Sequence, residues 1–203
     1  MSGKYDIVIA GVGGQGVVLA SRIIAKAALS VGYAVRTAEN IGMAQREGAV
    51  VSFTRLGETV EGPLVPESSA DLLLGFEPAE AARSLSKLVP GGVAIINKEP
   101  IVPVTVTTGQ SAYDQKAIFA YLEQQISELY YLEATKLATE AGNWRTTNSV
   151  LLGAAGSLEN FPVPSEVLLA ETLRNVPVKT RDVNQKAFEL GAAAVSGRKA
   201  QSA

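Results

Sequence analysis

The sequence predicts an α/β fold in which helices cover a mostly parallel sheet on both faces and a helical C-terminal third follows. Apolar runs typical of buried strands alternate with segments of helical period from Tyr5 to Glu133. Glycines follow the first apolar run and open the first helix-like segment. From Ala134 onward the pattern is helical, with breaks at 142–143, 160–164 and 176–177.

The first part of the chain is predicted to form a β-α-β unit, followed by a loop and a third strand. Gly32 ends the helix, and the loop is polar and bounded by glycines. Residues 56–59 are typical of a turn into a short strand at Val60, after which Pro63 and Pro66 limit regular pairing. The predicted elements are a strand at 5–10, a helix at 17–31, a strand at 33–38, a loop at 39–48 and a strand at 49–55.

The middle of the chain continues the alternation. A Pro-Gly-Gly turn precedes the second of its strands, and prolines at 100 and 103 favour an extended edge segment after it. The predicted elements are a strand at 70–75, a helix at 78–88, a strand at 92–97, the edge segment at 101–108, a helix at 113–126 and a strand at 129–133.

Length and composition indicate one domain that occupies residues 1–196, with a disordered tail at 197–203. The formal net charge is −2, and the absence of basic runs before the tail argues against a nucleic-acid partner. No apolar run is long enough for a membrane span, and no signal peptide is recognisable. We therefore expect a cytoplasmic protein that binds no membrane.

The chain contains neither cysteine nor histidine. Without cysteine it offers no thiolate nucleophile and no ligand for an iron–sulfur cluster. Without histidine it lacks the usual base near neutral pH and the usual nitrogen ligand for zinc. Any chemistry is then expected to depend on Glu, Asp, Lys, Tyr or Arg, on a bound cofactor, or on a partner chain, and the partner chain is favoured. We assign no catalytic and no metal-binding residue.

A glycine motif marks the first candidate site. Gly11, Gly13 and Gly16 fit the G-x-G-x-x-G pattern between a predicted strand and a predicted helix. The N–H groups of such a turn attract phosphates, and Glu39 stands where a dinucleotide-binding protein carries an acid for the ribose. The alternative is that the glycines serve close packing and that Glu39 is a solvated loop acid. Because ligands bind beyond the carboxyl ends of parallel strands, that edge is expected to carry the turn, the 39–48 loop and the turns after Gly75 and Asn97.

The loop at 39–48 marks the second candidate. Gly42 and Gly48 bracket Gln45 and Arg46, and an arginine beside an amide suits a phosphate, a carboxylate or a contact with a partner. An ion pair with Glu39 or Glu47 is the alternative. The chain then turns into a hairpin, where a hydride-transfer enzyme would add another β-α-β repeat.

Several segments in order resemble a known family. They read GVGGQGVVLASRII, GMAQREGAVVSFTRLG, PLVPESSADLLLGFEPAEAAR, PGGVAIINKEPIVP, NSVLLGAAGSL and VNQKAFELG. From Tyr5 to about Ala193 the chain resembles the gamma subunits or gamma domains of the 2-oxoacid:ferredoxin oxidoreductases, and among them the small (beta) subunits of the indolepyruvate enzymes. Glu47 departs from the family pattern, in which a small residue is expected.

The resemblance implies a three-layer α/β/α domain that carries no redox centre of its own. Thiamine diphosphate and the iron–sulfur clusters are then expected on a larger partner subunit, which also passes electrons to ferredoxin. The implied reaction is the oxidative decarboxylation of a 2-oxo acid, most simply an aryl pyruvate such as indolepyruvate, to an acyl-coenzyme A. By the same resemblance, the candidate contacts to coenzyme A or to the partner are Gly11, Gly13, Gly14, Gln15, Gly16, Gly42, Gln45 and Arg46.

Three functional hypotheses follow. The first is a non-cofactor subunit of this oxidoreductase, which covers the thiamine site of its partner and is not catalytic alone. The second is a stand-alone NAD(P)-binding oxidoreductase that uses Gly11, Gly13, Gly16 and Glu39. The third is an assembly module that binds no small molecule. An isolated subunit is also expected to form a homodimer through the face that normally meets its partner.

Overall fold

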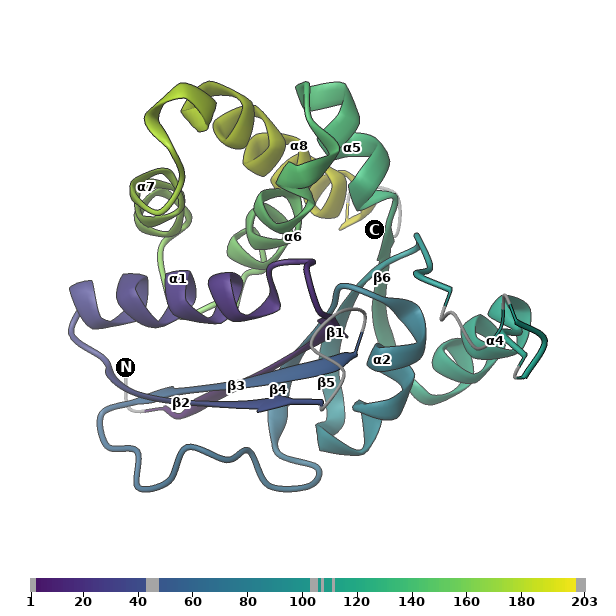
Figure 1. Ribbon diagram of the computed structural model, residues 1–203. Coiled ribbons are helices and arrows are strands. Elements are labelled where there is room, and N and C mark those ends of the chain that lie inside the picture. The colour runs from purple at the N-terminus through teal and green to yellow at the C-terminus, as the bar shows by residue number, and fades with distance from the viewer. Residues whose placement is uncertain (1–2, 43–47, 103–105, 107, 111, 200–203) are drawn as a thin grey trace.

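A computed structural model describes residues 3–42, 48–102, 106, 108–110 and 112–199. Its centre is a six-stranded sheet with the strand order β2-β3-β1-β4-β5-β6 (Figure 1). β2 pairs antiparallel with β3 and β3 with β1, while the pairs β1-β4, β4-β5 and β5-β6 are parallel. The strands are β1 (Tyr5–Val12), β2 (Ala34–Ile41), β3 (Ala49–Gly57), β4 (Ala70–Gly75), β5 (Leu88–Asn97) and β6 (Glu128–Leu132).

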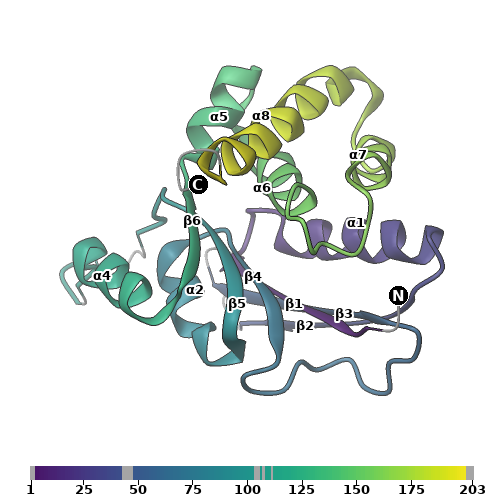
Figure 2. The same ribbon diagram turned by 180° about the vertical axis from the view of Figure 1, so that it is seen from behind.

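Helices cover both faces of the sheet, so the predicted three-layer α/β/α fold is confirmed (Figures 1 and 2). The layer on one face contains α1, α5, α6, α7 and α8, and the layer on the other face contains α2 and α4. The helices are α1 (Val17–Ser30), α2 (Pro78–Arg83), α4 (Gln115–Gln125), α5 (Ala134–Ala141), α6 (Thr147–Gly156), α7 (Ser165–Arg174) and α8 (Arg181–Lys199), with short 3-10 turns η1 (Leu85–Lys87), η2 (Trp144–Thr146) and η3 (Val178–Thr180).

The side chains of the central strands alternate between the two faces of the sheet, which explains why helices cover both faces. Ile7 and Ile9 of β1 belong to the core beneath α1 and α6, whereas Val8 and Ala10 belong to the core beneath α2 and α4. Successive side chains of a strand point to opposite faces, so a continuous apolar run needs a helical layer on each side. Within the described residues no helix has the length and apolar content that crossing a bilayer requires.

The structure corrects several element boundaries. The strand predicted at 33–38 continues to Ile41, because Glu39 and Ile41 pair with Ser52 and Val50 of β3. The helix predicted at 78–88 ends at Arg83, and β5 already begins at Leu88. The expected Pro-Gly-Gly turn therefore lies inside β5, where the register with β4 shifts.

Two predicted strands do not form among the described residues. Val60 is buried but pairs with no strand, and it lies in the long connection from β3 to β4. In the edge segment expected at 101–108, residues 103–105 and 107 lie outside the described residues, and the others form no strand. Of the tail expected at 197–203, residues 200–203 also lie outside them, while α8 extends to Lys199.

Candidate functional site

The glycine turn lies at the carboxyl end of β1 and leads directly into α1. Gly14 and Gly16 adopt positive φ angles of 96° and 87°, a conformation that favours glycine. Gly16 is the N-cap of α1, and no side chain accepts a hydrogen bond from the first turn of the helix. The turn therefore presents backbone N–H groups and the positive end of the helix dipole at the sheet edge where ligands bind in such folds.

Gly11 has a packing role that is independent of any ligand. A Cβ atom on Gly11 would lie 2.7 Å from Oε1 of Gln15 and 2.8 Å from Cβ of Phe76. Only glycine lets β1, the turn and the segment after β4 approach so closely. The packing explanation for the glycines thus holds at Gly11, whereas Gly14 has open space around its Cα and needs glycine for its backbone angles.

The side chain of Gln15 folds back onto the chain. Its Oε1 accepts a hydrogen bond from the Val12 N–H at 2.9 Å, and its Nε2 donates to the Phe76 carbonyl at 3.0 Å. Both functional atoms of the amide are engaged, so Gln15 fixes the shape of the turn.

Replacing Gln15 by glutamate tests this structural role. Glutamate keeps the acceptor for Val12 but places a second oxygen against the Phe76 carbonyl. We expect the free energy of unfolding to fall by about 1–2 kcal/mol, because a half-buried hydrogen bond is lost and two acceptor oxygens face each other. Urea denaturation measures it, with Gln124→Glu on the exposed side of α4 as the control. A stable variant with weakened ligand binding would instead indicate direct contact between Gln15 and a ligand.

The structure brings the two predicted site segments together. The Gly13 N–H donates to the Gly48 carbonyl at 2.9 Å, and the Gly42 N–H donates to the Ala49 carbonyl at 2.9 Å. Both ends of the glycine-bounded loop therefore lie at the carboxyl-terminal edge of the sheet, beside the glycine turn. Gln45 and Arg46 themselves lie outside the described residues.

Asn97 joins the strand ends at this edge and was not predicted as a site residue. It is buried, its Nδ2 donates to the Phe76 carbonyl at 3.3 Å, and its Oδ1 accepts from the Ala134 N–H at 3.1 Å. The Phe76 carbonyl thus accepts from both Gln15 and Asn97. This chain of hydrogen bonds ties the glycine turn to the start of α5.

Glu77 follows β4 and was also missed. It is only 1% exposed, and its Oε2 caps α2 by accepting from the Glu80 N–H at 2.9 Å. Tyr113 donates its hydroxyl to Oε1 of Glu77 at 2.5 Å. Burial and then the contact with Glu77 raise the pKa of the Tyr113 hydroxyl, which therefore stays protonated as the donor. The pair holds the segment before α4 against the end of β4.

Asn148 is the third residue that sequence reasoning did not assign to the site. Residues 148–158 were predicted to be mainly core, which the burial of positions 148–155 confirms. Asn148, however, lies in the first turn of α6, and its Nδ2 is 3.4 Å from the point where Gly16 would carry a Cβ atom. Its polarity within an otherwise apolar and small segment was the signal in the sequence.

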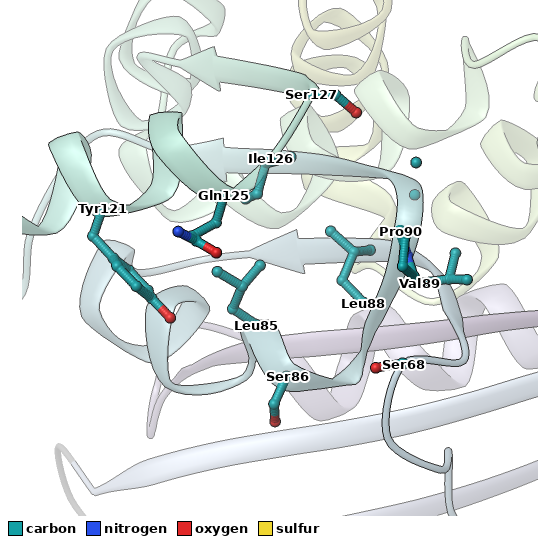
Figure 3. Close-up of a pocket in the computed structure, with 12 residues that line it drawn as sticks. Ser68, Leu85, Ser86, Leu88, Val89, Pro90, Tyr121, Gln125, Ile126 and Ser127 are labelled. Carbon is teal, nitrogen blue, oxygen red and sulfur yellow. The ribbon is translucent and has the colours of Figure 1, made fainter.

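Cavities lie at both ends of the strands, one at the carboxyl ends and one at the amino ends. One of about 420 Å³ adjoins the ends of β5 and β6 and is lined by Lys98, Glu99, Pro100, Gln115, Glu133, Thr135 and Lys136. Another, of about 290 Å³, lies at the opposite edge between η1 and α4 and contains no charged side chain (Figure 3). In the described part of the chain, no group of acidic side chains is arranged to hold a metal ion.

The strand order contradicts the NAD(P) hypothesis. A dinucleotide-binding fold places its second strand next to the first, so that the acid at its end reaches the ribose. Here β3 lies between β1 and β2, and Glu39 pairs with Ser52 of β3. The interposed strand puts Glu39 two strand spacings from β1, about 9–10 Å.

Comparisons with known proteins agree with this architecture. Residues 6–194 match the family model described as pyruvate ferredoxin/flavodoxin oxidoreductase. The chain is 46% identical over 193 residues to the indolepyruvate oxidoreductase subunit IorB of Thermococcus kodakarensis, and the match covers 93% of this chain and 94% of that protein.

Two solved structures share the fold. The gamma subunit of a keto/oxoacid ferredoxin oxidoreductase from Geobacter sulfurreducens superposes with a TM-score of 0.70 at 22% identity, covering 95% of this chain and 99% of that one. A 2-oxoglutarate:ferredoxin oxidoreductase from Magnetococcus marinus gives a TM-score of 0.71 at 19% identity. That match covers 97% of this chain and 32% of the longer one, so the same fold occurs there as part of a larger polypeptide.

Proposed function

The chain belongs to the pyruvate ferredoxin/flavodoxin oxidoreductase family, and we propose that it is the non-cofactor subunit of a cytoplasmic indolepyruvate or aryl pyruvate:ferredoxin oxidoreductase. The observation that carries the proposal is the 46% identity to an indolepyruvate oxidoreductase subunit over nearly the full length of both proteins. The reaction is the oxidative decarboxylation of the 2-oxo acid, with coenzyme A as the acyl acceptor and ferredoxin as the electron acceptor.

The composition of the chain supports a division of labour between two subunits. Because the chain has no cysteine, it offers no thiolate for an iron–sulfur cluster, and the clusters are assigned to the larger partner together with thiamine diphosphate. Bound there, thiamine diphosphate supplies the carbanion chemistry. The contribution of this chain is to cover the site and exclude water from it.

The glycine turn is the part of the chain that suits coenzyme A. It presents N–H groups at the positive end of α1, and the loop that contains Arg46 starts and ends beside it. The Magnetococcus marinus protein, one part of which has this fold, was solved with coenzyme A and succinyl-CoA bound, and we propose that this chain also contributes to a coenzyme A site. We propose that the phosphates or the partner are contacted by Gly13, Gly14, Gly16, Gln45 and Arg46. The shape of the two segments depends on Gly11, Gln15 and Gly42.

Anaerobic affinity purification of the chain from its native cytoplasm tests the subunit assignment. We expect a larger subunit in stoichiometric amount, iron–sulfur absorption, bound thiamine diphosphate, and ferredoxin reduction that requires both coenzyme A and a 2-oxo acid. Comparing indolepyruvate with pyruvate and 2-oxoglutarate identifies the substrate. Recovery of a colourless chain without a partner would contradict the proposal, and light scattering would then test whether that chain is a homodimer.

Replacing Arg46 by alanine tests the loop. We expect the KM for coenzyme A to rise by about 10-fold or more, which corresponds to the loss of one charge-assisted hydrogen bond. The complex should still assemble, and the KM for the 2-oxo acid should change little. Arg22→Ala, on an exposed position of α1, is the matched control for loss of a positive charge. If Arg46→Ala changed neither assembly nor kinetics, Arg46 would contact neither coenzyme A nor the partner.

A further inference from the structure

Asn148 is a buried polar residue whose hydrogen-bonding capacity is only partly used. The residue is 8% exposed, and its Oδ1 accepts from the Ser149 N–H at 2.9 Å. Within the described residues its Nδ2 has no hydrogen-bond acceptor, although it lies against Gly16. Nδ2 is not fully enclosed by the protein, so it is free to donate to an acceptor from outside the chain.

Two helix N-termini meet at Asn148. α1 has 14 residues and begins after Gly16, and α6 has 10 residues and begins at Thr147. Neither N-cap residue accepts a hydrogen bond through its side chain, and neither helix has an acidic residue in its first turn. Within the described part of the chain, the N–H groups of Gly14, Gly16 and Val17 also lack backbone acceptors. The positive ends of both dipoles therefore act on the same place, which favours an anion.

The chemical identity of residue 148 also points to an anionic ligand. An aspartate would give Ser149 the same acceptor and would interact more favourably with the positive end of α6. A carboxylate, however, would repel an anion bound at the adjacent glycine turn. Asparagine keeps the acceptor and adds a neutral donor, the combination that an anion beside Gly16 requires.

We infer that Asn148 donates a hydrogen bond from Nδ2 to a phosphate group held at the glycine turn. This inference rests on the proposed function for the identity of the ligand, coenzyme A. It adds a specificity-determining residue from the C-terminal helical third to the β1–α1 turn. α6 crosses above α1 near this turn, so Asn148 completes the site from the helical layer (Figures 1 and 2).

Substitution of Asn148 by aspartate separates recognition from folding. Aspartate has nearly the same shape and keeps the acceptor for Ser149, so the free energy of unfolding should be unchanged or higher. In the purified complex we expect the KM for coenzyme A to rise at least 10-fold, while the KM for the 2-oxo acid stays within about 2-fold. Asn160→Asp places the same charge on an exposed loop and should change neither KM.

A second measurement distinguishes failure of the inference from failure of the proposed function. If the wild-type complex turns over and Asn148→Asp leaves the KM for coenzyme A unchanged, the inference is wrong and the proposed function stands. If the wild-type protein reduces no ferredoxin with any 2-oxo acid, the proposed function is wrong, and titration of the full chain with inorganic pyrophosphate decides the inference. Binding by wild type that Asn148→Asp weakens at least 10-fold supports it, and equal binding or no binding by wild type overturns it.

Discussion

Gly153→Ala is expected to lower the free energy of unfolding by about 3 kcal/mol, because α6 and α8 touch backbone to backbone at this residue. A Cβ atom on Gly153 would lie 1.9 Å from the carbonyl oxygen of Phe188. The contact is reciprocal, since a Cβ atom on Gly191 would lie 1.9 Å from the carbonyl oxygen of Val150. A backbone atom of a packed helix cannot rotate away, so the two helices would have to separate. The clash should outweigh the gain of about 1 kcal/mol that alanine brings to a helix.

Urea denaturation of Gly153→Ala beside Gly156→Ala tests this prediction. Gly156 lies in the same helix, but a Cβ atom there would meet only side-chain atoms, the closest being Cδ2 of Leu168 at 3.1 Å. We therefore expect Gly156→Ala to change stability by less than about 1 kcal/mol. Equal stabilities of the two variants would contradict the close packing of α6 on α8. Because α6 also carries Asn148, a shift of this helix should weaken coenzyme A binding as well.

Arg55→Met is expected to cost about 3–5 kcal/mol, because it leaves a buried carboxylate without its main partner. Asp6 of β1 is 0% exposed, and Nε of Arg55 on β3 lies 3.0 Å from its Oδ1. Nη1 of Arg55 also donates to the carbonyls of Gly62 and Leu64, both at 3.0 Å. The substitution thus breaks an ion pair between two strands and releases the connection between β3 and β4.

Two further variants test the cause of that loss. Lys4 also pairs with Asp6, at 2.6 Å, but its side chain is 44% exposed, so Lys4→Met should cost less than about 1 kcal/mol. Adding Asp6→Asn to Arg55→Met removes the buried carboxylate, whose remaining partner is the half-exposed Lys4, and should restore part of the stability. Thermal and urea denaturation of the four proteins give the comparison. If Asp6→Asn restored nothing, the loss would be due to the released connection instead of the buried charge.

Local patterns in the sequence predicted most elements of the fold. The strand at 70–75 and the helix breaks at 142–143, 160–164 and 176–177 are confirmed, because apolar period, glycine and proline act over a few residues. The position of β3 was not predicted. The spacing of apolar residues shows which face of a strand is buried. The order of strands in the sheet, however, depends on pairing between segments that are distant in the sequence. The antiparallel insertion of β3 between β1 and β2 also extended β2 through Glu39 into the predicted loop.

The sequence by itself determined the glycine turn, the absence of thiol and imidazole chemistry, and the assignment to a family. Each depends on residue identity and on neighbours within one short segment. Only the tertiary structure decided that the Gln15 amide forms hydrogen bonds with Val12 and Phe76. It also decided that Asn97 links the end of β4 to the start of α5, and that Asn148 of α6 lies beside Gly16. These contacts join positions far apart in the chain. They form because packing of the whole core, which no local window contains, brings the strand ends and the helix N-termini to one edge of the sheet.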